Sequence, residues 1–199
     1  MKLQASTKRL VIRPLATADF QPWQDAYSNG RSKQNEWDIS PMQTSELTKS
    51  EFKKLLKQLK TLRDDDKFYD FGIFLKTTGE LIGRVSLMDV SRAVFQNAYL
   101  GYRIFNPHWK QGYGKEAVRG MLTFGFTELK LHRIEAGVAP GNRRSILLAR
   151  SLKMRKEGLK KRALYLGGKW VDIVIYTATC EDLGIKFKGN LKALAPQRR

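Results

Sequence analysis

The amino-acid sequence predicts an α+β fold, that is, a mixed α/β arrangement in which a mostly antiparallel central sheet carries helices on both faces. Two observations support this prediction. Three β-rich runs, at 68–76, 80–90 and 96–105, follow one another without a helical pattern between them. Segments with apolar residues at helical spacing come before and after these runs. The predicted order is β-α-α-β-β-β-α-β-α-β-β, which packs as one sheet between two layers of helices.

The first elements are predicted from the residues at their ends. Leu10–Pro14 reads as a short strand ended by proline, and Thr17 is a candidate N-cap for the helix that follows. Residues 29–44 are polar and rich in turn residues, which predicts a surface loop. Thr48 and Glu51 form a capping box that opens a second helix. The apolar face of that helix consists of Phe52, Leu55, Leu56, Leu59 and Leu62.

The middle of the chain joins the three β-rich runs to a third helix. Thr77–Gly79 is a hairpin turn between the first two runs. A helix is expected to begin near Lys115, because apolar residues then recur along one face. These residues are Val118, Met121, Leu122, Gly125, Phe126 and Leu129.

The last elements return to the sheet. Residues 132–139 predict a strand, and Asn142 follows a turn and can cap a helix over 143–152. The apolar face of this helix is expected to contain Ile146, Leu147 and Ala149. The runs 164–166 and 171–178 predict a closing hairpin around Gly167 and Gly168.

Length and composition fit one globular domain. The chain has 199 residues, 42% of them hydrophobic and 28% charged, which suffices for a buried core. We assign residues 1–183 to this domain and 184–199 to a basic C-terminal tail that we expect to be frayed. The single cysteine, Cys180, excludes an internal disulfide and a multi-cysteine zinc site. Neither a leader nor an apolar stretch of membrane-spanning length is seen, so a cytoplasmic protein without a membrane partner is expected.

The net charge of +18 is concentrated in the second half of the chain. Residues 100–199 contain 21 Lys and Arg against 7 Asp and Glu, whereas residues 1–99 contain 16 against 12. Such a field attracts anionic ligands and could hold the protein near RNA or the ribosome. The run 150–162, with seven basic residues and one acid, is the densest part of this charge. A solvated loop that binds nothing explains this run equally well.

The segment Asn106–Glu116 is the strongest candidate for a binding site. Gly112 and Gly114 follow a predicted strand and precede a predicted helix. A glycine-rich turn that opens a helix leaves several backbone N–H groups unpaired, and the helix dipole favours an anion there. From these residues alone, a pyrophosphate site and an ordinary strand–loop–helix connection are equally supported.

Motifs in a fixed order along the chain then resemble the GNAT acetyltransferases. Specifically, the chain resembles the ribosomal-protein N-acetyltransferases of the RimJ/RimL type, from Thr7 to about Asp182. No single motif is decisive, but their order and spacing are specific. The motifs are Tyr99–Tyr102, Trp109–Glu116, Leu131–Ala136, Asn142–Ser145 and Tyr165–Asp172.

The resemblance implies acetyl-CoA as the acyl donor. Backbone amides from about Gln111 to Lys115 would bind its pyrophosphate, and the pantetheine arm would lie between two splayed strands. Asn142 would hydrogen-bond that arm, and Ser145 would lie near the sulfur. The donor-binding residues that the resemblance implies are Ile104, Phe105, Trp109, Lys110, Gln111, Gly112, Tyr113, Gly114, Lys115, Asn142 and Ser145.

The resemblance also implies a reaction that needs no metal and no covalent enzyme intermediate. Acetyl transfer to an amine requires a neutral nitrogen, a polarised carbonyl and a protonated leaving thiol. Ser145 would stabilise or protonate the departing thiolate. Glu135, on the predicted strand 132–139 that would line the cleft, is the candidate base, although a role as a surface ion-pair partner is favoured over it. His108 and His132 are expected to be structural. Tyr99, Tyr102 and Tyr165 are expected to be packing aromatics, although any of them could line the acceptor site. A water-mediated route for the proton, or an acceptor amine that is already partly neutral, is therefore preferred.

Three departures from the family pattern stand out. Trp109 replaces the usual Gln or Arg before the first glycine, as is common in the RimJ/RimL subgroup. Leu152-Lys153-Met154 stands where the family often has Leu-Gly-Phe, so a left-handed helix end lacks its usual glycine. The segment 162–166 lacks the glutamate base that some relatives place there.

The expected function is therefore acetyl-CoA-dependent N-acetylation by direct attack of an amine on the thioester. The most favoured acceptor is the N-terminal α-amino group of a protein, with ribosomal proteins as the expected class. Two alternatives remain open: acetylation of a small amine, and a non-catalytic RNA- or ribosome-associated protein that keeps the fold.

Overall fold

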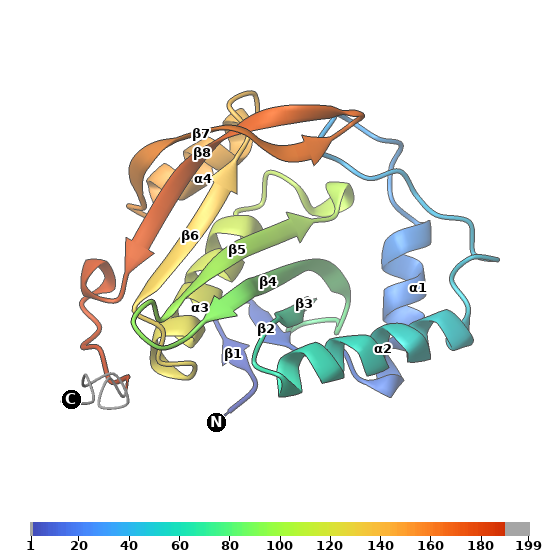
Figure 1. Ribbon diagram of the computed structural model, residues 1–199. Coiled ribbons are helices and arrows are strands. Elements are labelled where there is room, and N and C mark those ends of the chain that lie inside the picture. Colours follow the sequence, from blue (N-terminus) through green and yellow to red (C-terminus); the bar gives the residue numbers. More distant parts are fainter. Residues whose placement is uncertain (1, 190–199) are drawn as a thin grey trace.

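The computed structural model describes residues 2–189, in which eight strands form one sheet and four α-helices cover it (Figure 1). The strand order is β1-β2-β3-β4-β5-β6-β8-β7. The strands are β1 (Ala5–Ser6), β2 (Leu10–Arg13), β3 (Tyr69–Leu75), β4 (Leu81–Ser91), β5 (Asn97–Ile104), β6 (Arg133–Val138), β7 (Arg155–Leu166) and β8 (Lys169–Thr179). The helices are α1 (Phe20–Ser28), α2 (Lys49–Asp64), α3 (Tyr113–Thr127) and α4 (Arg143–Ser151).

One parallel pairing interrupts an otherwise antiparallel sheet. β5 and β6 run parallel and are paired only from Asn97 to Tyr99 against Arg133 to Glu135. Beyond Tyr99, β5 stays bonded to β4, and beyond Glu135, β6 stays bonded to β8. The sheet therefore opens into a V between the carboxyl ends of β5 and β6.

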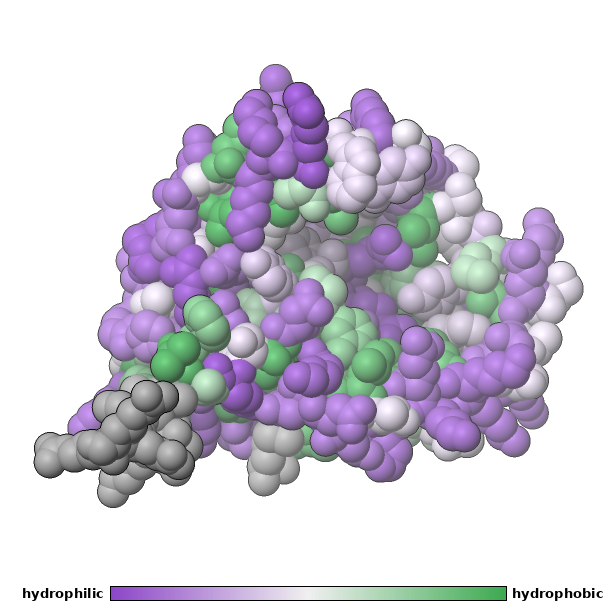
Figure 2. Space-filling view, viewed as in Figure 1, coloured by the Kyte–Doolittle hydropathy of each residue, from purple (hydrophilic) through white to green (hydrophobic). Residues whose placement is uncertain are grey.

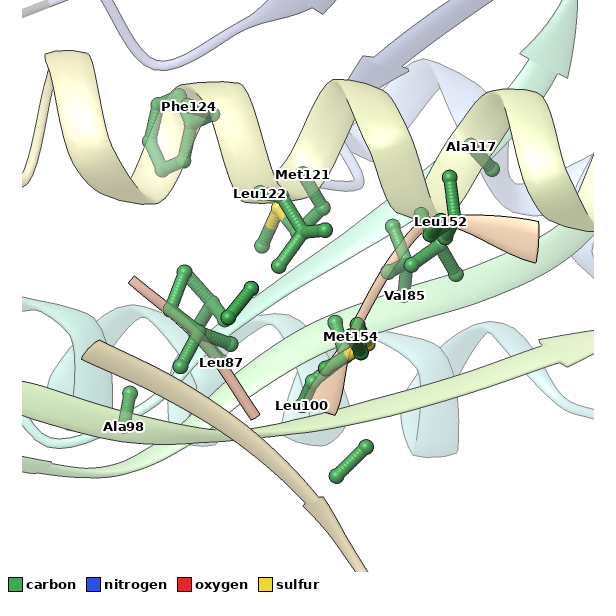
Figure 3. Packing of buried hydrophobic residues seen from close by; sticks show 14 of the residues in the cluster. Val85, Leu87, Ala98, Leu100, Ala117, Met121, Leu122, Phe124, Leu152 and Met154 are labelled. Atoms are coloured by element: carbon green, nitrogen blue, oxygen red, sulfur yellow. The ribbon is translucent and has the colours of Figure 1, made fainter. Parts of the chain in front are cut away.

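The main core lies between the sheet and α3, which packs on one face together with α4. Figure 3 shows Met121, Leu122 and Phe124 directed from α3 towards the strands that carry Val85 and Leu87. All five side chains are almost completely buried. Because α3 presents apolar residues at helical spacing to this face, burial fixes both its register and the position of its N-terminus.

A second apolar cluster joins the opposite face to α1 and α2. Phe52 of α2, Trp23 of α1 and Phe74 of β3 lie in it. Phe71, three residues before Phe74, instead contacts Phe124 of α3, with ring centroids 5.0 Å apart. Alternation along β3 therefore separates the two clusters, as expected for a sheet that is covered on both faces.

The structure confirms the predicted α+β class and the predicted order of elements, with the short strand β1 added. As predicted, Thr48 caps α2 by accepting a hydrogen bond from the Glu51 N–H at 3.2 Å. The 29–44 segment is irregular, as expected for a loop. No helix in the described part of the chain combines the length and apolar character needed to cross a membrane.

Four details of the sequence prediction were wrong. Thr17 does not cap α1 but begins a short 3₁₀ turn, Thr17–Asp19. α3 begins at Tyr113, two residues before the expected position. Leu147 is 64% exposed and is not part of the buried face of α4. The last hairpin begins at Arg155, so most of the basic run belongs to an edge strand and is not a loop.

The first residues of the predicted tail pack on the domain. Ile185 and Phe187 contact the main core, and the Phe187 ring meets the ring of His132 edge-on at 5.5 Å. Residues 190–199, the rest of the predicted tail, lie outside the described part of the chain.

As the sequence predicted, the left-handed position at the end of α4 lacks a glycine, and Lys153 occupies it. Its φ is 60°, and the Met154 N–H bonds the Ala149 carbonyl in a Schellman-type helix end. Because a side chain in this conformation costs roughly 1–2 kcal/mol, we expect Lys153→Gly to raise the free energy of unfolding by about 1 kcal/mol. Urea denaturation would measure this. Lys57→Gly, inside α2, is the control and should lower stability by about 1 kcal/mol.

Candidate active site

The V between β5 and β6 places alternate side chains on two sides of the sheet. Ala98 and Leu100 are buried in the main core, so Tyr102 and Ile104 point to the same face, towards α3 and α4. Tyr99 and Arg103 therefore point to the opposite face. Figure 2, seen from that opposite side, shows a hollow beneath the β7–β8 hairpin.

The glycine loop has the geometry of an anion cradle. Gly112 has a φ of 79° and is the N-cap residue of α3. The six consecutive N–H groups of residues 110–115 donate to no acceptor within residues 2–189. At a helix N-terminus these donors and the helix dipole both favour a multiply charged anion. The residues present therefore fit the pyrophosphate of a nucleotide-like ligand.

Arg9 of the β1–β2 turn supports this loop from behind. Its guanidinium donates to the Gln111 carbonyl at 2.9 Å and to Glu116 at 2.7 Å, and it lies 4.3 Å from the centre of the Tyr113 ring. Desolvation opposes ionisation of Glu116, but hydrogen bonds from Thr7 and Arg9 outweigh it and lower the pKa of the Glu116 carboxyl. Glu116 therefore stays charged at neutral pH and holds Arg9 against the loop.

Helix α4 closes the other side of the loop. Trp109 donates its indole N–H to the Ile104 carbonyl at 2.6 Å, and the Arg144 guanidinium lies 4.5 Å from the Trp109 ring centre. A Cβ on Gly114 would lie 3.1 Å from Leu148, so glycine permits this close packing of α3 and α4. Trp109 therefore joins the last residue of β5 to the first turn of α4.

Ser145 lies at the V, hydrogen-bonded to a partner on the facing strand. Asn142 caps α4 by accepting from the Ser145 N–H at 3.2 Å. The Tyr102 hydroxyl donates to Ser145 Oγ at 2.9 Å. Burial raises the pKa of the Tyr102 phenol, and the bond to Ser145 offsets only part of that rise. The phenol is therefore a proton donor over the whole neutral and mildly alkaline range.

Glu135 projects from β6 on the side away from Ser145. It is already paired, because Arg133 Nε lies 2.6 Å from its carboxylate. Arg133 also holds Glu157 on β7. These pairs favour a role for Glu135 as an ion-pair partner over a role as the catalytic base.

The other predicted residues divide between the cradle and the core. Ile104 lies beside the cradle, 3.6 Å from the position of a Cβ on Gly114. Phe105 is buried on the α1 side, where its ring meets Tyr27 edge-on at 5.0 Å. Its N–H bonds the Ile82 carbonyl, so Phe105 offers the V neither its side chain nor its amide. His108 pairs with Glu80 and His132 with Glu181, in agreement with structural roles.

The 29–44 loop crosses the mouth of the V. The buried side chain of Asn106 receives the Arg31 N–H and donates to the carboxylate of Asp38, both at 2.9 Å. Farther along the loop, Trp37 lies 3.7 Å from the position of a Cβ on Gly141, in the turn before α4. The loop thus spans from the end of β5 to the end of β6, as a wall of an acceptor site would.

One group of metal-ligating side chains occurs within the described residues, away from this site. His132, Cys180 and Glu181 lie near the start of β6, at the opposite end of that strand from the V. Burial, together with the Glu181 carboxylate, raises the pKa of the Cys180 thiol to about 11. The protonated thiol is a poor metal ligand.

The site can therefore bind a pyrophosphate-bearing ligand, pass its arm into the V and offer a proton there. Two of its contributors, Tyr102 and Arg9, were not predicted as functional from the sequence. Tyr102 was assigned to packing because its contact with Ser145 joins residues 43 positions apart. The sequence offered one signal for its role: Tyr102 lies two residues before the end of β5, the strand that leads into the glycine loop.

Comparison with known proteins agrees with this geometry. The family model of the acetyltransferase (GNAT) domain matches residues 9–155. The probable N-acetyltransferase YjcK of Bacillus subtilis is 32% identical over 83% of this chain and 91% of its own length. The [ribosomal protein uS5]-alanine N-acetyltransferase of Escherichia coli is 29% identical, with coverage of 91% and 93%.

Solved structures share the fold. RimJ of Mycobacterium smegmatis in complex with CoA-disulfide superposes with a TM-score of 0.75 at 23% identity, covering 90% of this chain and 88% of that chain. The family model spans the glycine loop, the V and the Ser145 helix in one continuous match. With that match, the chain belongs to the GNAT acetyltransferases and is an N-acetyltransferase of that family.

Proposed function

We propose that this protein transfers the acetyl group of acetyl-CoA to the N-terminal α-amino group of a protein, and we propose ribosomal proteins as the acceptor class. The observation that supports the proposal is the row of unpaired N–H groups at 110–115. The strand before this row and the helix packed beside it carry the hydrogen-bonded pair Tyr102 and Ser145. A donor bound by its pyrophosphate at this row would extend its arm along α4 into the V. The proposed donor site comprises Ile104, Trp109, Lys110, Gln111, Gly112, Tyr113, Gly114, Lys115, Asn142 and Ser145.

In the proposed reaction, the amine nitrogen attacks the thioester carbonyl from the side of the sheet opposite α3. A carbon–nitrogen bond forms, the carbon–sulfur bond breaks, and the sulfur leaves as a thiolate. Ser145 gives its hydroxyl proton to the thiolate while its oxygen takes the proton of the Tyr102 hydroxyl, which is already directed at Ser145 Oγ, and water then returns a proton to Tyr102. The proton lost by the nitrogen passes to water, because Glu135 is paired with Arg133.

This scheme favours an acceptor amine that is partly neutral near pH 7. An α-amino group has a pKa of about 8, whereas a lysine or polyamine nitrogen has a pKa above about 10. A site without a dedicated base therefore suits an α-amine. The name of the Escherichia coli relative, a uS5-alanine N-acetyltransferase, supports a ribosomal protein as the acceptor class.

Turnover on matched acceptors tests the proposal. Purified protein and acetyl-CoA should acetylate a peptide with an N-terminal alanine, and mass spectrometry should place the acetyl group on the α-nitrogen. The same peptide with a blocked N-terminus and one internal lysine should not react. Faster turnover on spermidine than on every peptide would instead assign the protein to small-amine acetylation.

The β7–β8 hairpin supports a second proposal, a contact with RNA. Tyr165 and Trp170 face each other across the hairpin with ring centroids 5.5 Å apart and are 60% and 62% exposed. Lys160, Lys161 and Arg162 precede Tyr165 on β7, and Lys169 precedes Trp170 on β8. Exposed aromatic rings among basic residues bind single-stranded RNA by stacking and charge together.

We expect Trp170→Ala to weaken binding of a single-stranded RNA oligonucleotide about tenfold, since stacking contributes roughly 1–3 kcal/mol per base. Fluorescence anisotropy at two salt concentrations would measure this. Phe95→Ala is the matched control, because Phe95 is 63% exposed in the β4–β5 loop, away from the hairpin. Equal RNA affinity for both variants and the native protein would assign the aromatic pair another role.

A further inference from the structure

Two arginines lie directly opposite each other on the open side of the V. Arg84 of β4 and Arg103 of β5 are cross-strand partners, so their side chains share one face of the sheet. Like charges in this position repel and destabilise the strand pair. Asp70 of β3 neutralises Arg84 through a largely buried ion pair. Arg103 is exposed and has no ion-pair or hydrogen-bond partner for its side chain within residues 2–189.

Arg103 is also close to the reacting groups. It follows Tyr102 in β5, and alternation along the strand turns the two side chains to opposite faces. Tyr102 meets Ser145 on the donor side. Arg103 therefore lies one residue from the proposed proton donor, on the side from which an acceptor must approach. Figure 2 shows this side of the molecule, with its hollow below the hairpin.

The other charges around this hollow leave an excess of positive charge. Lys160 of β7 donates to the Tyr99 hydroxyl at 3.1 Å, which leaves its charge without a carboxylate partner. Glu135, the carboxylate on β6, is bound to Arg133. Within residues 2–189, the acceptor side of the V thus presents Arg103 and Lys160, neither of which forms an ion pair. The Glu36 carboxylate, 3.8 Å from the position of a Cβ on Gly141, also lies at the mouth and offsets part of this positive charge.

From this arrangement we infer that the acceptor is an N-terminal segment with an acidic side chain within its first three residues. The inference rests on the proposed function and specifies the substrate class of that same site. In an extended peptide the Cα atom of the third residue is about 7 Å from that of the first. A carboxylate at position 2 or 3 can then pair with Arg103 while the amine reaches the thioester. The same cations repel polyamines, which carry positive charge along their whole length.

Peptides of one length that begin with alanine and carry Glu, Gln or Lys at positions 2 and 3 would test this inference. For the native protein we expect kcat/KM to be about tenfold higher for Glu than for Lys, which corresponds to about 1.4 kcal/mol. Arg103→Glu should reverse the preference, and Arg103→Gln should abolish it. Arg119→Glu, an identical charge change on the exposed side of α3, should preserve it. The preference should shrink as salt rises.

Binding separates failure of this inference from failure of the proposed function. Fluorescein-labelled peptides, added to protein saturated with CoA, report acceptor affinity by anisotropy without turnover. Equal affinities for the Glu and Lys peptides, or an unchanged preference in Arg103→Glu, overturn the inference even if both peptides are acetylated. Absence of turnover with every peptide contradicts the proposed N-terminal acetylation, whereas an Arg103-dependent affinity for the Glu peptide still supports the assigned acceptor surface.

Discussion

Gly112→Val is expected to weaken binding of acetyl-CoA about 100-fold, or about 2.7 kcal/mol. Gly112 is in the left-handed region, where a β-branched residue is strongly disfavoured, so valine must rotate the loop backbone. That rotation would turn the N–H groups of residues 110–115 away from a common centre. A Cβ at this position would also lie 3.5 Å from Arg9, which supports the loop. Isothermal titration calorimetry with CoA would measure the loss.

Gly79→Val separates loss of the cradle from backbone strain alone. Gly79 has nearly the same φ, 74°, and lies at the exposed β3–β4 turn, where an added Cβ would have no atom within 4 Å. Its valine variant should lose a similar amount of stability and bind CoA normally. Normal CoA affinity in the Gly112 variant would refute the assignment of this loop.

Ser145→Ala and Tyr102→Phe are expected to lower kcat by about 100-fold each, while CoA affinity changes less than about twofold. Both substitutions remove the hydroxyl groups at the V and leave the pyrophosphate cradle untouched. Because the two hydroxyls form one hydrogen-bonded unit, the double variant should be little slower than either single variant. Pre-steady-state measurement of thiol release would locate the defect in the chemical step.

Tyr99→Phe is the matched control for Tyr102→Phe, since Tyr99 lies on the same strand but faces the other side of the sheet. It should retain most of the kcat with a neutral peptide. Additive losses in the Ser145 and Tyr102 variants would show that the hydroxyls act separately. Unchanged turnover in Ser145→Ala would remove Ser145 from the mechanism.

Local patterns were sufficient to predict most of the fold. Thr48 and Asn142 cap the helices that their positions predicted, because capping depends on residues three positions apart. Gly112 and Gly114 marked the turn that opens α3, although the helix begins at Tyr113 and not near Lys115 as predicted. The parallel pairing of β5 with β6, and hence the V, followed from the resemblance and not from any local pattern.

Features that depend on distant contacts were harder to predict. Tyr102 and Arg9 act through partners 43 and 107 positions away, so neither neighbourhood in the sequence reveals the role. For the basic run 150–162, a solvated loop was one of the explanations left open, but β7 forms over most of it. Pairing with β8 stabilises that strand, and irregularities at Gly158 and before Leu164 disrupt the period-two pattern.

The short parallel seam has a consequence for motion. Only residues 97–99 of β5 pair with β6, so the sheet consists of two hydrogen-bonded leaves joined over three residue pairs. A donor arm inserted into the V would bridge the leaves where the backbone does not. Amide hydrogens along β6 near the opening should therefore exchange with deuterium more slowly once CoA is bound, whereas those between β3 and β4 should be unaffected. The rate of deuterium exchange along β6 therefore indicates whether the donor site is occupied.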